Sequence, residues 1–345
     1  MTKSRVLLAN VHIMMAYAFR SLERIDDAPR STAEFERLHD LLAEIIASET
    51  SRQVKRGLDH GYLEETRELQ TVRGRIDLQW SIRQRSFVRG SLVCRYDEFV
   101  ADTDLNRAVR ATVLLLARHG NVAPHRRDAL ARLLPFFAGV RAVDPRAIRW
   151  KDLQLNRVNA SYRWLLAACE LTVKGLLPTD GNGDTLLPWL NDETMSTLFE
   201  RFVKEYFRFH HPRLDAKAAH IPWAAEMDGV GLHQLPAMRT DITLHDNNSM
   251  LIIDTKYYGS SMQVSQYGRE TLHSGNLYQI HTYVKNASAL GAPVSGLLLY
   301  ARTDGPVQPD LDVVIGGHRI GATTLDLTKP WPLLRAELDA LLDRF

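Results

Sequence analysis

The chain has 345 residues, with 43 basic and 41 acidic side chains and a formal net charge of +2. Its hydrophobic fraction of 45% and charged fraction of 24% are those of a globular protein and exclude disorder throughout the chain. The near balance of charge excludes a polybasic tail, so any binding of nucleic acid must come from a local patch. Its two cysteines, Cys94 and Cys169, cannot build a disulfide framework and fit a reducing compartment.

The first half of the chain is predicted to be mainly helical. Apolar residues recur near a period of 3.6, with Thr32 as a plausible N-cap and Glu34 in the turn after it. The predicted helices cover residues 7–25, 32–58, 104–119, 124–138 and 151–176. Residues 60–100 differ, because short apolar segments around Gly74 and Gly90 are typical of strands.

A domain boundary is predicted near residue 180. Residues 177–184 combine turn formers with little apolar content and resemble a linker, which gives domains over 1–180 and 185–345. The second domain is predicted to contain helices over 193–209, 275–289 and 331–343 and strands over 218–224, 236–245, 249–257, 294–301, 311–316 and 319–326. This order predicts an α/β (α+β) domain with a central mixed sheet flanked by helices.

One hairpin carries the candidate chemistry. The segment 240–244 alternates like a half-buried strand, and 251–257 begins with the continuous apolar run of a central strand. A turn centred on Asn247 and Asn248 would place Asp241 opposite Asp254, with Lys256 on the same face as Asp254.

Two buried carboxylates in that arrangement repel one another and resist ionising together. A divalent cation removes this cost, and oxygen ligands suit Mg²⁺ or Mn²⁺. The neighbouring Lys256 would orient a water or stabilise charge on a phosphate, so the pattern favours metal-assisted phosphodiester hydrolysis. The competing interpretation is a surface ion pair at the end of a strand.

Neighbouring helices extend the candidate site. Gln279 and Tyr283 are four residues apart on one helix face, where they would hold the lysine or a DNA phosphate. Alternatively, Tyr283 is a core residue. Glu200 or Glu205, on the preceding helix, would supply a further carboxylate to the metal, and a solvated charge is the alternative role for at least one of them.

Several other chemistries are excluded by missing motifs. The sequence has no Gly-x-x-x-x-Gly-Lys-Ser/Thr nucleotide loop, no Gly-x-Ser-x-Gly elbow and no His-Glu-x-x-His. Its N-terminal apolar run is too short for a signal peptide, and no segment approaches the ~20 apolar residues of a membrane span. We therefore expect a cytoplasmic protein that meets no membrane.

These residues together resemble a known family. Asp241, Asp254-Thr-Lys256 and Gln279-x-x-x-Tyr283 are similar to the PD-(D/E)XK nucleases, and more closely the chain resembles the McrC family, the nuclease subunits of McrBC modified-cytosine restriction systems. The resemblance covers nearly the full length and rests on the segments 10–19, 74–77, 102–107, 238–244, 251–258 and 273–279. One departure is the absence of proline before the first aspartate, where Thr240 stands and the nearest proline is Pro236.

The resemblance implies a division of labour. The second domain would be an Mg²⁺-dependent DNA endonuclease with Asp241, Asp254 and Lys256 as its catalytic set, assisted by Gln279 and Tyr283. Metal ligands would be Asp241, Asp254, the Thr255 backbone carbonyl and Glu200, with Glu205 as its alternative. The first domain would bind and stimulate a separate hexameric AAA+ GTPase, which would recognise double-stranded DNA with modified cytosine.

Residues 60–100 would then project into the partner's ring, and a solvated hairpin is the alternative. The arginines of the projection that would serve this contact are Arg73, Arg75, Arg83, Arg85 and Arg89. A second basic set would contact DNA or an acidic partner, or form an ordinary solvated face; it comprises Arg126, Arg127, Arg132, Arg141, Arg146 and Arg149.

Two other functions are alternatives to an endonuclease subunit that acts with a GTPase. One is a non-catalytic adaptor with a nuclease fold that only regulates an AAA+ partner; the intact Asp, Asp, Lys set argues against it. The other is a stand-alone DNA nuclease or junction resolvase, which would not need the first domain. Because a duplex break needs two strand cuts, two nuclease domains are expected to act as a dimer.

Overall fold

The computed structural model describes residues 8–24, 38–120, 122–176, 192–225, 230–246, 248–257, 261–264 and 269–344. The chain forms two compact units: one contains residues 1–36 and 180–345, and the other contains residues 37–179. The units meet in the sequence at residues 36–37 and 179–180, while the predicted linker over 177–184 and the N-cap Thr32 lie outside the described residues. Residues 1–36 do not belong to the first unit as predicted, because helix α1 packs elsewhere.

The helical unit, residues 37–179, packs four helices around an apolar core. Their bounds are α2 Leu38–Arg56, α4 Asp104–His119, α5 Pro124–Ala131 and α6 Tyr162–Leu176. Helix α4 begins where predicted, because the Thr103 side chain accepts a hydrogen bond from the Asn106 backbone and caps its first turn. Residues 124–138 form α5 and a separate 3-10 turn, Leu134–Phe137, instead of one helix.

The helix predicted over 151–176 is wrong in its first part, because α6 begins only at Tyr162. Asn156 accepts hydrogen bonds from the backbone of Val158 and Asn159, and Asn159 accepts one from the backbone of Asn156. These side-chain hydrogen bonds stabilise a turn and compete with the backbone hydrogen bonds of a helix.

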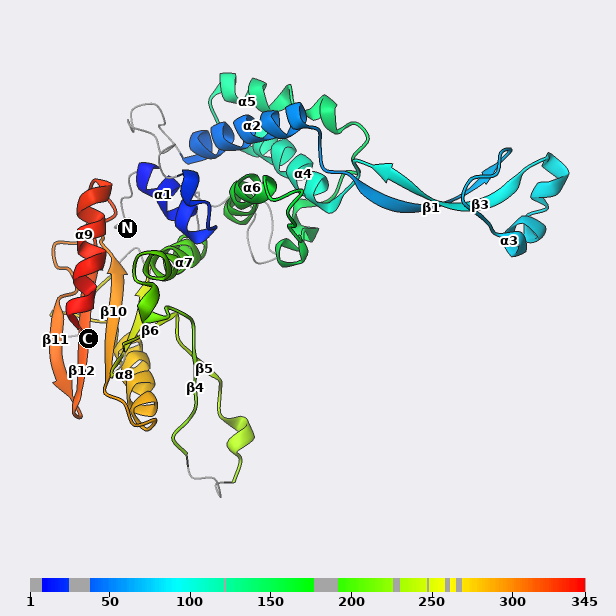
Figure 1. The fold of residues 1–345 in the computed structure, drawn as a ribbon. Coiled ribbons are helices and arrows are strands. Elements are labelled where there is room, and N and C mark those ends of the chain that lie inside the picture. The colour runs from blue at the N-terminus through cyan, green and yellow to red at the C-terminus, as the bar shows by residue number, and fades with distance from the viewer. Residues whose placement is uncertain are drawn as a thin grey trace. The chain divides into compact units, whose positions relative to one another are not determined.

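The predicted strand-rich excursion forms an arm, here residues 61–100. Strands β1 (Gly61–Leu69) and β3 (Leu92–Val100) pair antiparallel along their whole length, and β2 (Arg75–Ile76) joins β3. At the far end lie the short helix α3 (Leu78–Arg83) and a 3-10 turn (Ser86–Arg89), which the sequence did not predict (Figure 1). Large apolar side chains are exposed at this tip, namely Leu78, Trp80, Ile82, Phe87 and Val88.

The second unit is built on a five-stranded mixed sheet in the order β11-β12-β10-β7-β6. The strands are β6 Ile242–His245, β7 Met250–Lys256, β10 Val294–Ala301, β11 Leu311–Ile315 and β12 His318–Leu325. Strand β10 is parallel to β7 and β12, whereas β6 and β11 run antiparallel to their neighbours. The α/β domain with a central mixed sheet that the sequence predicts is therefore present.

Besides α1, the described part of the second unit contains three further α-helices and four short strands. The helices are α7 Asp192–His210, α8 Ser274–Ser288 and α9 Trp331–Ala340. The short strands are β4 His220–Ile221, β5 Met238–Arg239, β8 Gln263–Val264 and β9 Glu270–Thr271. The strand predicted over 236–245 is broken into β5 and β6, and the break at residues 240–241 contains one of the candidate site residues.

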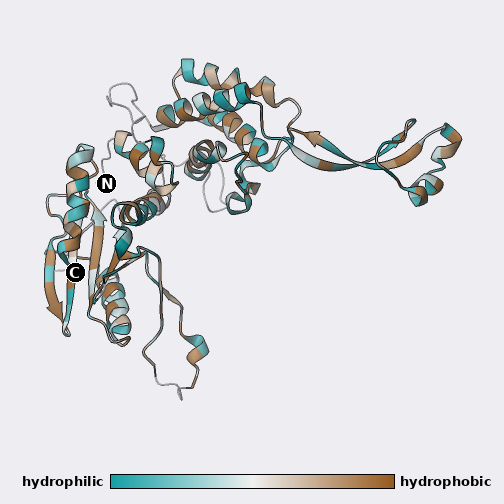
Figure 2. Cartoon of the chain, in the orientation of Figure 1, coloured by the Kyte–Doolittle hydropathy of each residue, from teal (hydrophilic) through white to brown (hydrophobic). Residues whose placement is uncertain are grey.

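Helix α8 covers one face of the sheet. Its buried residues Ile280, Tyr283 and Val284 share an apolar core with Ile252 of β7 and with β10 and β12. The contact is close at Gly296 on β10, where an added Cβ would lie 2.7 Å from a methyl group of Val284. The central strands are hydrophobic (brown in Figure 2), and consecutive residues of β7 are buried, so both faces of the sheet are covered.

Helix α1 (Leu8–Ala18) completes the second unit. It packs along α7, and the buried Asn10 side chain donates hydrogen bonds to the backbone oxygens of Leu327 and Lys329 at 2.7 and 2.8 Å. Tyr17 bonds to His210 on α7, and Arg20 makes a bidentate ion pair with Glu205. These contacts explain why residues 1–36 separate from the helical unit. Within the described residues, no helix is both long and apolar enough to cross a membrane.

Candidate active site

The hairpin of β6 and β7 has the register that the sequence predicts. Ile242 pairs with Ile253 and His245 pairs with Met250, so paired residue numbers sum to 495. Asp241 lies in a bend immediately before β6, one position outside the ladder. Asn247, half of the predicted turn, lies outside the described residues.

Asp254 is buried near the carboxyl end of β7. Its residue is 1% exposed, and neither carboxylate oxygen accepts a hydrogen bond from the described residues. The ammonium of Lys256 lies 2.5 Å from Oδ2, in ion-pair contact without hydrogen-bond geometry. Burial raises the pKa of Asp254 to about 6, the charge of Lys256 opposes this rise, and the charges of Asp241 and Glu200 add to it.

The Asp241 carboxylate turns toward the backbone after Asp254. Its Oδ2 accepts hydrogen bonds from the Thr255 backbone N–H at 2.8 Å and from the Thr255 hydroxyl at 2.9 Å. Asp241 therefore lies beside Asp254, close enough to affect its pKa, but is oriented by Thr255. The sequence did not predict a role for the Thr255 side chain. The only sign of one in the sequence is that this hydroxyl residue lies between Asp254 and Lys256.

Helix α8 holds the lysine through a chain of hydrogen bonds. The Lys256 ammonium donates to Gln279 Oε1 at 3.2 Å, and Gln279 Nε2 donates to the Tyr283 hydroxyl at 3.0 Å. Tyr283 is also buried in the core beneath the sheet, so both of its predicted environments occur together. The amide of Gln279 thus fixes the direction of the lysine while the tyrosine fixes the amide.

The two glutamates of α7 have different surroundings. Glu205 is bound by Arg20 and Arg208 and serves to hold α1 on α7. Glu200 bonds to Lys204 at 3.0 Å, and its charge contributes to the raised pKa of Asp254. Of the two, Glu200 is the carboxylate whose charge reaches the site.

The donor set suits a hard cation, although its ligands are not gathered in place. Across the described residues, no three His, Cys, Asp or Glu side chains stand close enough to hold a metal ion. Two observations nevertheless fit a cation: the unbonded oxygens of buried Asp254, and the repulsion between Asp254 and two other carboxylates. Carboxylate oxygens are the ligands that Mg²⁺ and Mn²⁺ prefer.

The fold and the site define an α/β protein with a buried aspartate and a held lysine at the carboxyl end of an internal strand of a mixed sheet. The chain belongs to the McrBC family, because residues 5–301 match the family described as "McrBC 5-methylcytosine restriction system component".

Two relatives extend this result. The chain is 27% identical over 340 residues to the "Type IV methyl-directed restriction enzyme EcoKMcrBC" of Escherichia coli (strain K12), covering 97% of both chains. Its fold is similar to a chain in the structure described as a "refined half-complex from tetradecameric assembly of Thermococcus gammatolerans McrB AAA+ hexamers with bound McrC". That match has a TM-score of 0.50 and 17% identity, and covers 95% of this chain and 76% of the other.

Proposed function

We propose that the protein is the Mg²⁺-dependent DNA endonuclease subunit of a modified-cytosine restriction system, with a PD-(D/E)XK nuclease fold in its second unit. The observation that carries the proposal is the buried Asp254, whose oxygens lack hydrogen bonds while Lys256 lies beside it. Membership in the McrBC restriction family supports the nucleic-acid substrate. A purely structural ion pair would not explain a second carboxylate, Asp241, held next to it.

Asp241, Asp254, the Thr255 carbonyl and Glu200 would hold Mg²⁺ or Mn²⁺. The bound ion would supply charge to polarise the scissile phosphate and to lower the pKa of a water. Lys256 would donate to the attacked phosphate or orient the water that attacks it. Gln279 would keep the Lys256 ammonium directed at the site, and Tyr283 would hold Gln279 in turn. Helix α8 therefore sets the position of the lysine.

We infer that the chain acts with, and stimulates, a separate McrB-like AAA+ GTPase. Support comes from the similar structure, which is described as containing McrB AAA+ hexamers with bound McrC. This chain has no nucleotide-binding loop of its own. The arm, with its exposed apolar tip, is the surface proposed for that contact. The assembly would act in the cytoplasm on double-stranded DNA with modified cytosine, with two nuclease units forming a dimer so that both strands are cut.

The test is to separate DNA cleavage from GTPase stimulation. Asp254→Asn keeps the side-chain shape but removes the charge, so cleavage with the partner and Mg²⁺ should fall by orders of magnitude. GTPase stimulation should stay near the wild-type level, because it belongs to the helical unit. Asp310→Asn, at an exposed aspartate of the same unit, is the matched control and should keep both activities.

Each competing function predicts a different result. Unchanged cleavage by Asp254→Asn would place the nuclease site elsewhere. If neither the wild type nor the variant cleaves DNA while both stimulate the partner, the chain is a non-catalytic adaptor. Robust cleavage by the wild-type chain without the GTPase would identify a stand-alone nuclease.

A further inference from the structure

The arm is a long two-stranded ribbon that is attached to the helical unit at one end. Its two long strands pair with each other over nine residue pairs, from Gly61–Val100 to Leu69–Leu92, a ribbon about 30 Å long at ~3.3 Å per residue. A two-stranded ribbon is marginally stable in water and twists easily. Its direction must therefore be fixed where both strands join the helical unit.

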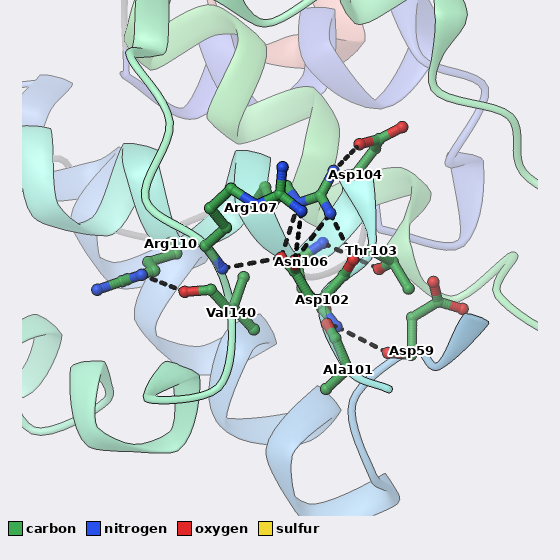
Figure 3. A network of polar contacts seen from close by, with 10 residues as sticks. Asp59, Ala101, Asp102, Thr103, Asp104, Asn106, Arg107, Arg110 and Val140 are labelled. Atoms are coloured by element: carbon green, nitrogen blue, oxygen red, sulfur yellow. Dashed lines mark hydrogen bonds and ion pairs between the residues drawn. The ribbon is translucent and has the colours of Figure 1, made fainter. Parts of the chain in front are cut away.

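Asn106 on α4 ties the two strands together at that junction (Figure 3). The residue is completely buried, and its Nδ2 donates to the Asp59 carbonyl at 2.8 Å and to the Ala101 carbonyl at 2.7 Å. Asp59 precedes β1 and Ala101 directly follows β3. One amide group therefore binds the entry and the exit of the arm to the same helix.

Tyr162 adds a second helix to the junction. Its buried hydroxyl donates to Asn106 Oδ1 at 2.7 Å and accepts from the Asp59 backbone N–H at 2.9 Å. Tyr162 is the first residue of α6, so α4 and α6 are both connected to the entry of the arm. Burial raises the pKa of Tyr162 to about 12, which keeps the hydroxyl protonated and able to donate.

Asp102 anchors the exit of the arm by charge. Its carboxylate receives two hydrogen bonds from the Arg107 guanidinium at 2.7 and 2.8 Å (Figure 3). It also accepts the Arg141 backbone N–H at 2.8 Å, from the segment after α5. The hydrogen bonds from Arg107 hold the pKa of Asp102 well below its usual range, so it stays ionised at neutral pH.

We propose that Asn106, Tyr162 and Asp102 form a positioning clamp that fixes the angle of the arm on the helical unit, so that the arm meets the AAA+ partner already oriented. The inference rests on the proposed function, because the benefit is realised only when the arm binds a partner. An arm that swings freely must lose that freedom on binding, which weakens binding without changing the bound state. The three residues act through the arm and need not touch the partner.

Tyr162→Phe tests the clamp, because it removes one hydroxyl and keeps the packing. Thr172→Val is the matched control on the same helix: it also removes one buried hydroxyl, which bonds only back to the Ala168 carbonyl. Tyr162→Phe loses both hydrogen bonds of the hydroxyl, and we expect it to raise the chain concentration for half-maximal GTPase stimulation about threefold to tenfold. The maximal stimulation should stay within about twofold of wild type, and Thr172→Val should change neither quantity.

A direct readout measures the arm itself. One spin label is attached at Gln84→Cys on the tip of the arm and one at Arg132→Cys on the helices, and the distribution of distances between the two labels is measured. The native Cys94 and Cys169 are buried and do not react with the label. The distance distribution should broaden in Tyr162→Phe and Asp102→Asn and remain narrow in Thr172→Val. Asp102→Asn also serves if Tyr162→Phe fails to fold.

The outcomes separate the two proposals. Unchanged distance distributions in both clamp variants overturn the clamp, whatever the GTPase result. A lower plateau with unchanged half-maximal concentration also overturns it, because the residues would then act on hydrolysis and not on orientation. If the wild-type chain stimulates no AAA+ GTPase, the proposed function fails, while the distance distributions still decide whether the clamp exists.

Discussion

Asp254 has an unusual environment for an aspartate. It is buried, its oxygens accept no hydrogen bond from the described residues, and a single lysine lies against it. Removing the carboxylate from water favours its protonated form, and this effect exceeds the opposing charge of Lys256. The result is a carboxylate whose pKa is raised to about 6 and whose charge a bound cation would stabilise.

Metal binding is therefore expected to depend on pH. Because the pKa of Asp254 is raised to about 6, Asp254 is ionised and able to bind at pH 7.5 but increasingly protonated below pH 6. Calorimetric titration with Mn²⁺ should show an affinity that falls up to about tenfold for each unit below pH 6. The rise in melting temperature that Mn²⁺ produces should shrink over the same range.

The raised pKa of Asp254 also changes how the stability of the metal-free protein depends on pH. A raised carboxyl pKa means that the folded protein holds a proton between pH ~4 and pH ~6 that the unfolded chain has released, so metal-free stability falls as pH rises through this window. Asp254→Asn should remove both the Mn²⁺ response and this pH dependence. Equal Mn²⁺ binding by wild type and Asp254→Asn would contradict the site.

At the scale of elements, the tip of the arm depends on one tight backbone approach. Gly74 has φ +66°, and a Cβ there would lie 2.4 Å from the Arg95 carbonyl on β3 and 2.7 Å from the Tyr96 Cβ. Three residues later, Asp77 caps α3 by accepting the Trp80 backbone N–H at 3.0 Å. The Gly74–Asp77 segment thus turns the chain into β2 and starts the helix at the tip.

Gly74→Ala should loosen the tip of the arm. The clash with β3 adds to the cost of a positive φ, so hydrogen exchange of β2 and of the β3 residues beside it should accelerate at least tenfold. Gly90→Ala is the control, because Gly90 also has φ +66° but its Cβ would meet nothing within 4 Å. Equal exchange in the two variants would show that backbone strain alone, and not close packing, selects glycine at position 74.

Local patterns predicted part of these elements well. The register of the β6–β7 hairpin follows from two apolar strands and a short turn, and the Gln279–Tyr283 contact follows from helix geometry. The helix predicted over 151–176 is absent over 151–161, because Asn156 and Asn159 bond to nearby backbone, a competition that apolar spacing does not reveal. The ion pair that occupies Glu205 could not be predicted, because its partner Arg20 is 185 residues away in the sequence.

At the scale of the molecule, the second unit is discontinuous. It begins with α1, is interrupted by residues 37–179, and resumes at residue 180. Asn10 links its two parts, because its buried amide serves the Leu327 and Lys329 carbonyls. A fragment that starts at residue 185 would lack α1 and would leave these carbonyls and the apolar side of α7 exposed to water.

Asn10→Ala should therefore weaken the second unit alone. Losing the donor for two carbonyls should cost about 1–3 kcal/mol, seen as faster hydrogen exchange in β12, α9 and α7. The matched variant is Gln53→Ala, since buried Gln53 donates to the Ser161 carbonyl and accepts the Ser161 hydroxyl within the helical unit. Its effect should appear in α2 and α6 instead. A uniform loss of protection in both units for either variant would show that they do not unfold separately.

The interrupted order of the second unit has a consequence during synthesis on the ribosome. Asn10 and its partner Leu327 are 317 residues apart. At a translation rate of about 5–20 residues per second, roughly 15–60 s pass between the synthesis of α1 and that of the segment that packs on it. Residues 37–179 are all translated in that interval, before the last strand of the sheet is made. A newly made chain therefore has its whole helical unit and arm before it can close the unit that carries Asp254, and the acidic site forms only after residues 37–179 have been translated.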